Sequence, residues 1–168
     1  MPARNAPVNV TPEQLGAWIT RWGGPLQAWL RGRCASPEDV VQETFCRLAQ
    51  QRRAPERVSA WLFQVAANLM REEHRRAARE SRRFQEVARP EARPCDLERQ
   101  VEADDLRQNI DGLPDELREV LIARLWGELT FQDISRLVGV SAATVQRRYE
   151  RSLILLRERL GEPSSHRR

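Results

Sequence analysis

Residues 129–160 contain the pattern that most narrows the possible folds: two amphipathic helical segments separated by a glycine. With successive residues about 100° apart around a helix axis, the second segment has a continuous apolar side. That side consists of Val145, Tyr149, Leu153, Leu156 and Leu160. The opposite side is polar and basic, with Ala143, Thr144, Arg147 and Arg151 at its centre and Gln146 and Arg148 at its margins. Such a helix packs its apolar side on a core and leaves its basic side available to a polyanion.

The connection between the two segments has the features of a helix-turn-helix. The apolar side of the first segment consists of Phe131, Ile134, Leu137 and Val138. Gly139 ends that segment, and Ser141 is a favourable N-cap for the next one. A helix-turn-helix places its second helix in the DNA major groove. The alternative is an ordinary helical hairpin with a solvated basic side, and this stretch alone does not exclude it.

Composition and charge favour helices and a polyanionic partner. Helical periodicity recurs in nearly every segment and no strand-like alternation persists, so we predict an all-α fold of two small domains. All 28 basic residues are arginine, which suits phosphate and guanine contacts, although a GC-rich genome explains the same bias. The net charge of +4 is uneven: residues 1–94 carry +6, residues 95–120 carry −6 and residues 141–168 carry +4. The two basic blocks indicate two places for a polyanion.

Cysteines, histidines and hydropathy exclude several other classes. Cys34, Cys46 and Cys95 have no CxxC spacing, and His74 and His166 complete no metal-ligand set, so we interpret the cysteines as cytosolic thiols. No membrane-span-like run or signal-peptide pattern is present, and we expect a cytoplasmic protein. Without a Ser/His/Asp set, metal cluster or glycine-rich phosphate loop, we expect neither an enzyme nor a cofactor.

The predicted N-terminal domain begins with two helical segments. The first has apolar residues at helical spacing on both sides of a break at residues 23–25: Leu15, Trp18, Ile19 and Trp22 before it, and Leu26, Trp29 and Leu30 after it. We interpret its tryptophans as core residues. The second starts at Ser36 as N-cap, with Pro37 at the first helical position and Asp39 near a capping-box position. Its predicted inner face is Val41, Thr44, Phe45 and Leu48, and its outer face is Asp39, Gln42, Glu43, Cys46 and Gln50. On physical grounds alone this outer face is a solvated acidic surface.

A long helix with a basic stripe follows over residues 59–84. Its predicted inner face consists of Leu62, Val65, Ala66 and Leu69. Polar and basic residues recur at spacings of three or four on the other side: Gln64, Asn68, Arg71, Arg75, Arg79 and Arg82. A solvated charged face is the simpler interpretation. Because the chain also has a helix-turn-helix pattern, we favour a second nucleic-acid surface.

A proline-containing stretch divides the chain. We predict a first domain over residues 8–86, a linker over 87–97, a second domain over 98–162 and a disordered tail over 163–168. The second domain begins with an acidic stretch containing Val101, Leu106 and Ile110. The next helix opens near Pro114, ends at Gly127 and has a predicted inner face of Leu117, Val120, Leu121 and Leu125.

With these residues in hand, nearly the whole chain resembles a bacterial sigma factor of the sigma-70 family, extracytoplasmic-function type. Three motifs carry the resemblance, in the family's order and spacing: SPEDVVQETFCRLA, AWLFQVAANLMREEHRR, and LPDELREVLIARLWGELTFQDISRLVGVSAATVQRRYERSLILLRERL. Tyr149 stands where relatives usually have leucine and Ser135 where they usually have alanine, and both residues fit a core-facing site. The family is one of transcription initiation factors that perform no chemistry themselves.

The resemblance implies partners and site residues. Core RNA polymerase, through the clamp of its largest subunits, is expected to bind Asp39, Gln42 and Glu43. The promoter −10 element is expected to contact Asn68, Arg71, Arg75, Arg76 and Arg79, with the loop 51–58 receiving a flipped base. The −35 element is expected to contact Ser141, Thr144, Gln146, Arg147, Arg148 and Arg151. An anti-sigma factor, which in some cases holds its partner at the membrane, is a further expected partner.

Two other interpretations compete with this one. A helix-turn-helix repressor or activator would bind an operator without polymerase, usually as a dimer. No separate dimerisation segment is evident, and this interpretation leaves the acidic helix and the basic stripe unexplained. A sigma-like protein that has lost polymerase binding is the other alternative. The presence of Asp39, Gln42, Glu43 and Phe45 argues against it.

Overall fold

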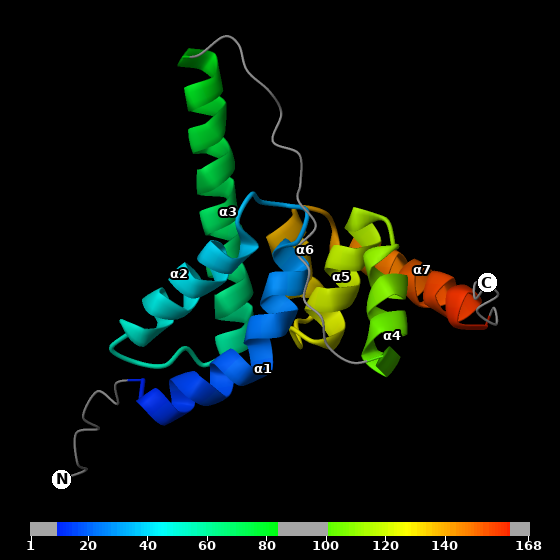
Figure 1. Ribbon diagram of the computed structural model, residues 1–168, viewed down its shortest axis with the longest axis horizontal. Helices are drawn as coiled ribbons and strands as arrows, with labels where there is room; N and C mark the ends of the chain where they lie inside the picture. The colour runs from blue at the N-terminus through cyan, green and yellow to red at the C-terminus, as the bar shows by residue number, and fades with distance from the viewer. Residues whose placement is uncertain (1–9, 84–100, 162–168) are drawn as a thin grey trace. The chain divides into compact units, whose positions relative to one another are not determined.

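The computed structural model describes residues 10–83 and 101–161 (Figure 1). Within these ranges the chain forms seven helices and no strand, so the all-α prediction is confirmed. The chain divides into two compact units, one built from the helices before residue 84 and the other from the helices after residue 100. The predicted linker over 87–97 and tail over 163–168 lie outside the described residues. None of the described helices is both long and apolar enough to span a membrane.

The first unit is a three-helix assembly of α1 (Pro12–Leu30), α2 (Pro37–Ala49) and α3 (Val58–Arg83). Each of the three helices packs against the other two. Their shared core consists of Trp22, Leu26, Trp29, Leu30, Val40, Phe45, Leu48, Leu62, Phe63, Ala66, Ala67 and Met70. At its centre the rings of Trp29 and Phe63 meet edge to face, with centroids 5.5 Å apart. Residues 74–80 of α3 are all exposed, and this end of the helix extends past α1 and α2 (Figure 1).

The predicted break at residues 23–25 is wrong, because α1 continues through it. Pro25 lies inside the helix, where its ring removes one backbone hydrogen bond and crowds the carbonyl four residues earlier. The helix accordingly changes direction part way along (Figure 1). Burial on both sides of Pro25, at Trp22 and Leu26, holds the two halves on one core.

Several predicted inner and capping positions in this unit differ in the structure. Trp18 is only half-buried and Ile19 is exposed, because the N-terminal part of α1 reaches beyond the core. In α2 the buried valine is Val40 and not Val41. Ser36 is the N-cap of α2, but its side chain makes no capping hydrogen bond. The N-terminus of α1 instead carries a capping box, formed by Thr11 with residue 14.

The second unit consists of α4 (Val101–Asp111), α5 (Asp115–Leu125), α6 (Phe131–Val138) and α7 (Ala142–Gly161). Helix α7 is its axis and packs against each of the other three. The core consists of Ile110, Leu113, Leu117, Val120, Leu121, Ile122, Ala123, Leu129, Ile134, Leu137, Val145 and Leu156. Leu125 and Leu160, which were predicted to face inward, are exposed because each lies at the end of its helix.

The turn between α6 and α7 confirms the helix-turn-helix pattern. Thr130 and Asp133 form a capping box at the start of α6. Gly139 ends the helix with φ 77° and ψ 24°, the left-handed conformation that favours glycine. Ser141 then accepts a hydrogen bond from the backbone N–H of Thr144 at 3.1 Å, as an N-cap does. The hydroxyl of Ser135 donates to the carbonyl of Val140 at 2.6 Å, which ties α6 to the turn.

The end of α7 is joined to the end of α4 by one arginine. The two terminal nitrogens of Arg159 donate to the carbonyls of Asn109 and Gly112, each at 2.9 Å. These carbonyls belong to the C-terminal turn of α4, where backbone acceptors lack partners within the helix. A Cβ atom on Gly112 would lie 2.5 Å from Nη1 of Arg159, so the absence of a side chain at residue 112 makes this contact possible.

Candidate functional site

The outer face of α7 presents most of the residues predicted to contact the −35 element. Ser141, Gln146, Arg147 and Arg151 are exposed, and Thr144 is half-buried. The hydroxyls of Ser141 and Thr144 lie 2.9 Å apart at the start of the helix, and Arg147 donates to Thr144 at 3.3 Å. This arrangement concentrates donors and positive charge on the first two turns of α7, the part of a recognition helix that contacts base edges.

Arg148 differs from the other predicted −35 residues. Its side chain is 23% exposed and is directed toward α5, where Nη2 donates to Oε2 of Glu116 at 2.5 Å. Its Nη1 lies 3.8 Å from Oε1 of Glu119, whose side chain is 12% exposed. Arg148 is thus partnered within its own unit.

Glu150 is a residue of this face that the sequence prediction missed. It is exposed, and its carboxylate accepts a hydrogen bond from Gln146 at 3.0 Å. With successive residues about 100° apart, Glu150 lies between Gln146 and Arg147, on the side of the outer face away from Arg151. Because the prediction selected for positive charge, an acid was passed over, although a carboxylate accepts a hydrogen bond from the amino group of cytosine.

The basic stripe of α3 begins with a chain of hydrogen bonds one turn apart. The side-chain oxygen of Asn68 accepts from Gln64 at 3.2 Å and from Arg71 at 3.1 Å. Arg75 in turn donates to the carbonyl of Arg71 at 3.3 Å. Asn68 and Arg75 are exposed and Arg71 is half-buried. These side chains share one face of α3, as the sequence predicted.

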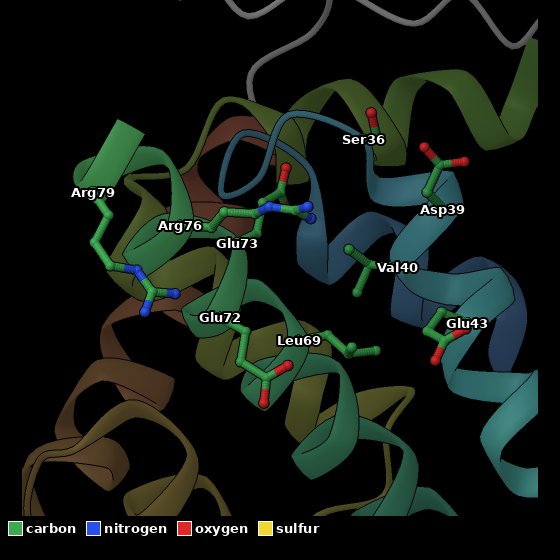
Figure 2. A pocket seen from close by; sticks show the side chains of 9 residues that line it. All are labelled: Ser36, Asp39, Val40, Glu43, Leu69, Glu72, Glu73, Arg76 and Arg79. Carbon is green, nitrogen blue, oxygen red and sulfur yellow. The ribbon is translucent and has the colours of Figure 1, made fainter. Parts of the chain in front are cut away.

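The other two arginines predicted to contact the −10 element, Arg76 and Arg79, line a groove beside α2 (Figure 2). The groove encloses about 630 Å³ and is lined by Ser36, Asp39, Val40, Glu43, Leu69, Glu72, Glu73, Arg76 and Arg79. Arg76 also forms an exposed ion pair with Glu80 at 3.6 Å. Two residues predicted for polymerase, Asp39 and Glu43, therefore share a groove with two predicted for DNA.

The acidic face of α2 is exposed along its length, as predicted. Asp39, Gln42 and Glu43 all lie on it, and Glu43 accepts a hydrogen bond from Arg47 at 2.7 Å. Gln42 lines a second groove, of about 430 Å³, on the other side of α2. This groove is largely apolar and includes Ile19, Phe45 and the exposed Cys46. The polar face of α2 thus forms a ridge between two hollows.

Near the start of α2, Cys34 is a half-buried thiol. Burial, and after it the neighbouring carboxylate of Glu73, raise the pKa of Cys34 to about 11. The thiol donates weakly to the carbonyl of Leu30 at 3.7 Å. It therefore stays protonated at neutral pH. Within the described residues no group of three or more His, Cys, Asp or Glu side chains is arranged to hold a metal ion.

The glycine turn, the capped second helix and its exposed basic face define a DNA-binding protein of the helix-turn-helix class. Residues 18–80 match the family description "Sigma-70 region 2", and residues 103–156 match "Sigma-70, region 4". The chain therefore belongs to the sigma-70 family of RNA polymerase sigma factors, whose members are initiation factors and not enzymes. Its similarity to an ECF RNA polymerase sigma factor, SigE, indicates the extracytoplasmic-function type.

Two curated relatives and one solved structure are similar to the chain. The ECF RNA polymerase sigma factor SigE of Mycolicibacterium smegmatis is 30% identical over 152 residues, covering 81% of this chain and 56% of SigE. The probable RNA polymerase sigma factor RfaY of Xanthomonas campestris is 27% identical over 137 residues, covering 75% of this chain and 34% of RfaY. The chain thus spans about half of the length of SigE and about a third of the length of RfaY. The sigma factor RpoE of Bartonella quintana, solved in complex with the anti-sigma factor NepR, has the same fold: TM-score 0.60, 19% identity, 94% of this chain and 100% of that one covered.

Proposed function

We propose that this chain binds core RNA polymerase and directs it to promoters by contacting −35 and −10 elements. One observation carries the proposal. A single chain combines a capped helix-turn-helix with exposed arginines and a separate unit in which an acidic helix lies beside a basic one. A repressor needs only the first of these, whereas a polymerase-borne promoter reader uses both.

Helix α7 would enter the major groove of the −35 element. Its exposed side chains offer guanidinium donors for guanine and phosphate and an amide for adenine. The residues proposed for this contact are Ser141, Thr144, Gln146, Arg147 and Arg151, all exposed or half-buried on one side of the helix. Arg147 and Arg151 are one turn apart, so they can follow one edge of the groove.

Helix α3 would contact the −10 element and the strand released from it. Asn68, Arg71 and Arg75 form one connected polar face, with Arg76 and Arg79 continuing toward the free end of the helix. Guanidinium groups bind the backbone of a single strand and stack on its bases. The neighbouring loop 51–58, with exposed Arg52 and Arg53, is proposed to receive a base flipped from the opening duplex.

The polar ridge of α2, with Asp39, Gln42 and Glu43, would bind core polymerase. Tethering both DNA-reading units to one polymerase makes the second promoter contact intramolecular, so affinity rises without additional contacts. The complex of RpoE with an anti-sigma factor supports a further proposal, that an anti-sigma factor also holds this chain. All of these partners imply a location in the cytoplasm.

The test is co-elution of the purified chain with bacterial core RNA polymerase, followed by transcription from a library of genomic fragments. We expect a stable complex that initiates at sites sharing a two-part sequence. Initiation at fragments without any shared sequence would contradict promoter reading. A folded chain that fails to bind polymerase but binds DNA as a dimer would instead identify an operator-binding regulator.

A further inference from the structure

The arginines of α7 point in two directions. Arg147 and Arg151 are exposed on the outer face, whereas Arg148 and Arg159 are half-buried and reach other helices of the same unit. Arg148 contacts α5 near one end of α7, and Arg159 contacts the end of α4 near the other. Helix α7 is thus held by a guanidinium group toward each end.

The contact of Arg148 has the geometry of a built ion-pair cluster. Glu116 and Glu119 are three residues apart, so their carboxylates lie on one side of α5, about one turn from each other. One terminal nitrogen of Arg148 is 2.5 Å from Glu116 and the other is 3.8 Å from Glu119. The planar guanidinium group suits this two-carboxylate arrangement, which an ammonium group cannot match.

The low exposure of Arg148 favours its contact with α5 over a contact with DNA. Arg148 is 23% exposed, so its poorly hydrated guanidinium group would have to give up two carboxylate neighbours to reach a DNA phosphate. Glu116 is 59% exposed, which weakens its own share of the interaction. If Arg148 moved to a DNA phosphate, the carboxylates of Glu116 and Glu119 would also lose its positive charge while lying near the negatively charged DNA.

We propose that Arg148 is a positioning residue that fixes the rotation of α7 on α5, and is not a DNA contact. Residues 146 and 147 directly precede it, so its contact with α5 determines how their side chains are presented. The proposal rests on the proposed function only in that α7 is the helix that enters DNA.

The decisive measurement is whether Glu116→Gln weakens or strengthens the binding of the polymerase complex to promoter DNA. If Arg148 positions α7, Glu116→Gln and Arg148→Gln both weaken binding of the polymerase complex to a promoter duplex recovered with the unaltered chain. We expect about a three- to tenfold loss for each, the size of a partly exposed charged hydrogen bond. The double variant should lose little more than Arg148→Gln alone. Asp115→Asn is the matched control, because it removes an equal charge from the adjacent residue and breaks a different ion pair, that of Asp115 with Arg118.

If Arg148 contacts a phosphate, the opposite follows. Glu116→Gln would release the arginine and bind DNA as tightly as Asp115→Asn or more tightly, and that result overturns the proposal. Hydrogen exchange of the free chain provides a readout that needs no promoter. The amides of residues 145–150 should exchange faster in Glu116→Gln and Arg148→Gln than in Asp115→Asn, and unchanged exchange also overturns the proposal. If the unaltered chain directs no initiation, the proposed function fails, and hydrogen exchange alone decides the role of Arg148.

Discussion

At the scale of single residues, one carboxylate lies among the basic side chains on the outer face of α7. Glu150 lies between Gln146 and Arg147 on the outer face, and its carboxylate accepts a hydrogen bond from Gln146. A negative charge at this place repels every phosphate equally, so it lowers affinity for DNA in general. It favours only a sequence that offers a donor to the carboxylate, which makes it a determinant of selectivity.

The Glu150→Gln variant tests this role. We expect it to bind a random-sequence duplex about threefold more tightly at low salt, because a repulsive charge beside the phosphates is lost. The gain should fade as salt is raised. Glu158→Gln is the control, since this exposed acid lies on the same helix about 12 Å farther along. Equal gains in both variants, measured by fluorescence anisotropy, would contradict a local role for Glu150.

The two described cysteines should react at very different rates. At pH 8 a thiol with a pKa of about 11 has roughly a hundredfold less thiolate than one with the ordinary value of 9.0. In a Cys95→Ser variant, maleimide should therefore modify the exposed Cys46 first and Cys34 slowly. The rate at Cys34 should rise steadily as pH increases toward 11. Mass spectrometry over time would reveal equal rates if burial did not protect Cys34.

A helical projection could not predict the hydrogen-bond partner of Arg148. The sequence pattern placed Arg148 at the margin of the polar side of α7, which is where the structure has it. Its partner Glu116 lies 32 residues earlier, and no local pattern connects the two. Periodicity correctly predicted that Gln146, Arg147 and Arg151 are exposed. It could not predict that Arg148 contacts an acid of the same unit, because that contact depends on how α7 packs on α5.

At the scale of elements, the turn between α6 and α7 depends on one backbone conformation. Gly139→Ala should destabilise the second unit by about 1–2 kcal/mol, the cost of a Cβ in the left-handed region. No atom lies within 4 Å of the added Cβ, so a steric clash would not be the cause. Gly139→Asn should lose less, because asparagine tolerates this conformation. Calorimetric unfolding that ranked alanine above asparagine would contradict this explanation.

Helix ends were the least predictable parts of the elements. The sequence predicted an interruption at Pro25 because proline inside a helix is costly, and the structure instead has one helix that continues through Pro25 and changes direction part way along (Figure 1). Burial of Trp22 and Leu26 on one core outweighs the local preference. Conversely, Gly139 and Ser141 were predicted correctly, because their effects depend only on residues within one turn.

At the scale of the whole molecule, the proposed function assigns separate tasks to the two units. Arg147→Ala should reduce initiation by about 5- to 150-fold, corresponding to a lost base contact of about 1–3 kcal/mol, while polymerase binding stays unchanged. Glu43→Lys should instead weaken polymerase binding, because it replaces one of the two acids of the α2 ridge by a base. Glu13→Lys makes the same charge change on an exposed part of α1 and serves as the control. Co-elution and runoff transcription separate the two effects, and loss of both activities in either folded variant would disprove the division.

The helical type of the elements followed from periodicity, whereas the grooves beside α2 did not. A pattern with a period of 3.6 residues identifies which side of a helix is apolar. It does not reveal that Asp39 and Arg76 line the same groove, because that depends on how α2 and α3 cross. The residues predicted for polymerase and those predicted for DNA were assigned to different helices, and only the tertiary structure shows that two of each line one groove.

The contact between Arg159 and the end of α4 has a consequence for how this chain can mutate. The guanidinium group occupies the space that a side chain at residue 112 would fill. Any replacement of Gly112 must therefore displace Arg159, and a shorter residue at 159 opens room at 112. The stability effects of substitutions at the two positions, which are 47 residues apart, should therefore not be additive. In a library that varies both, a side chain at residue 112 should cost about as much as the two hydrogen bonds of Arg159, and should cost little more once residue 159 is shortened.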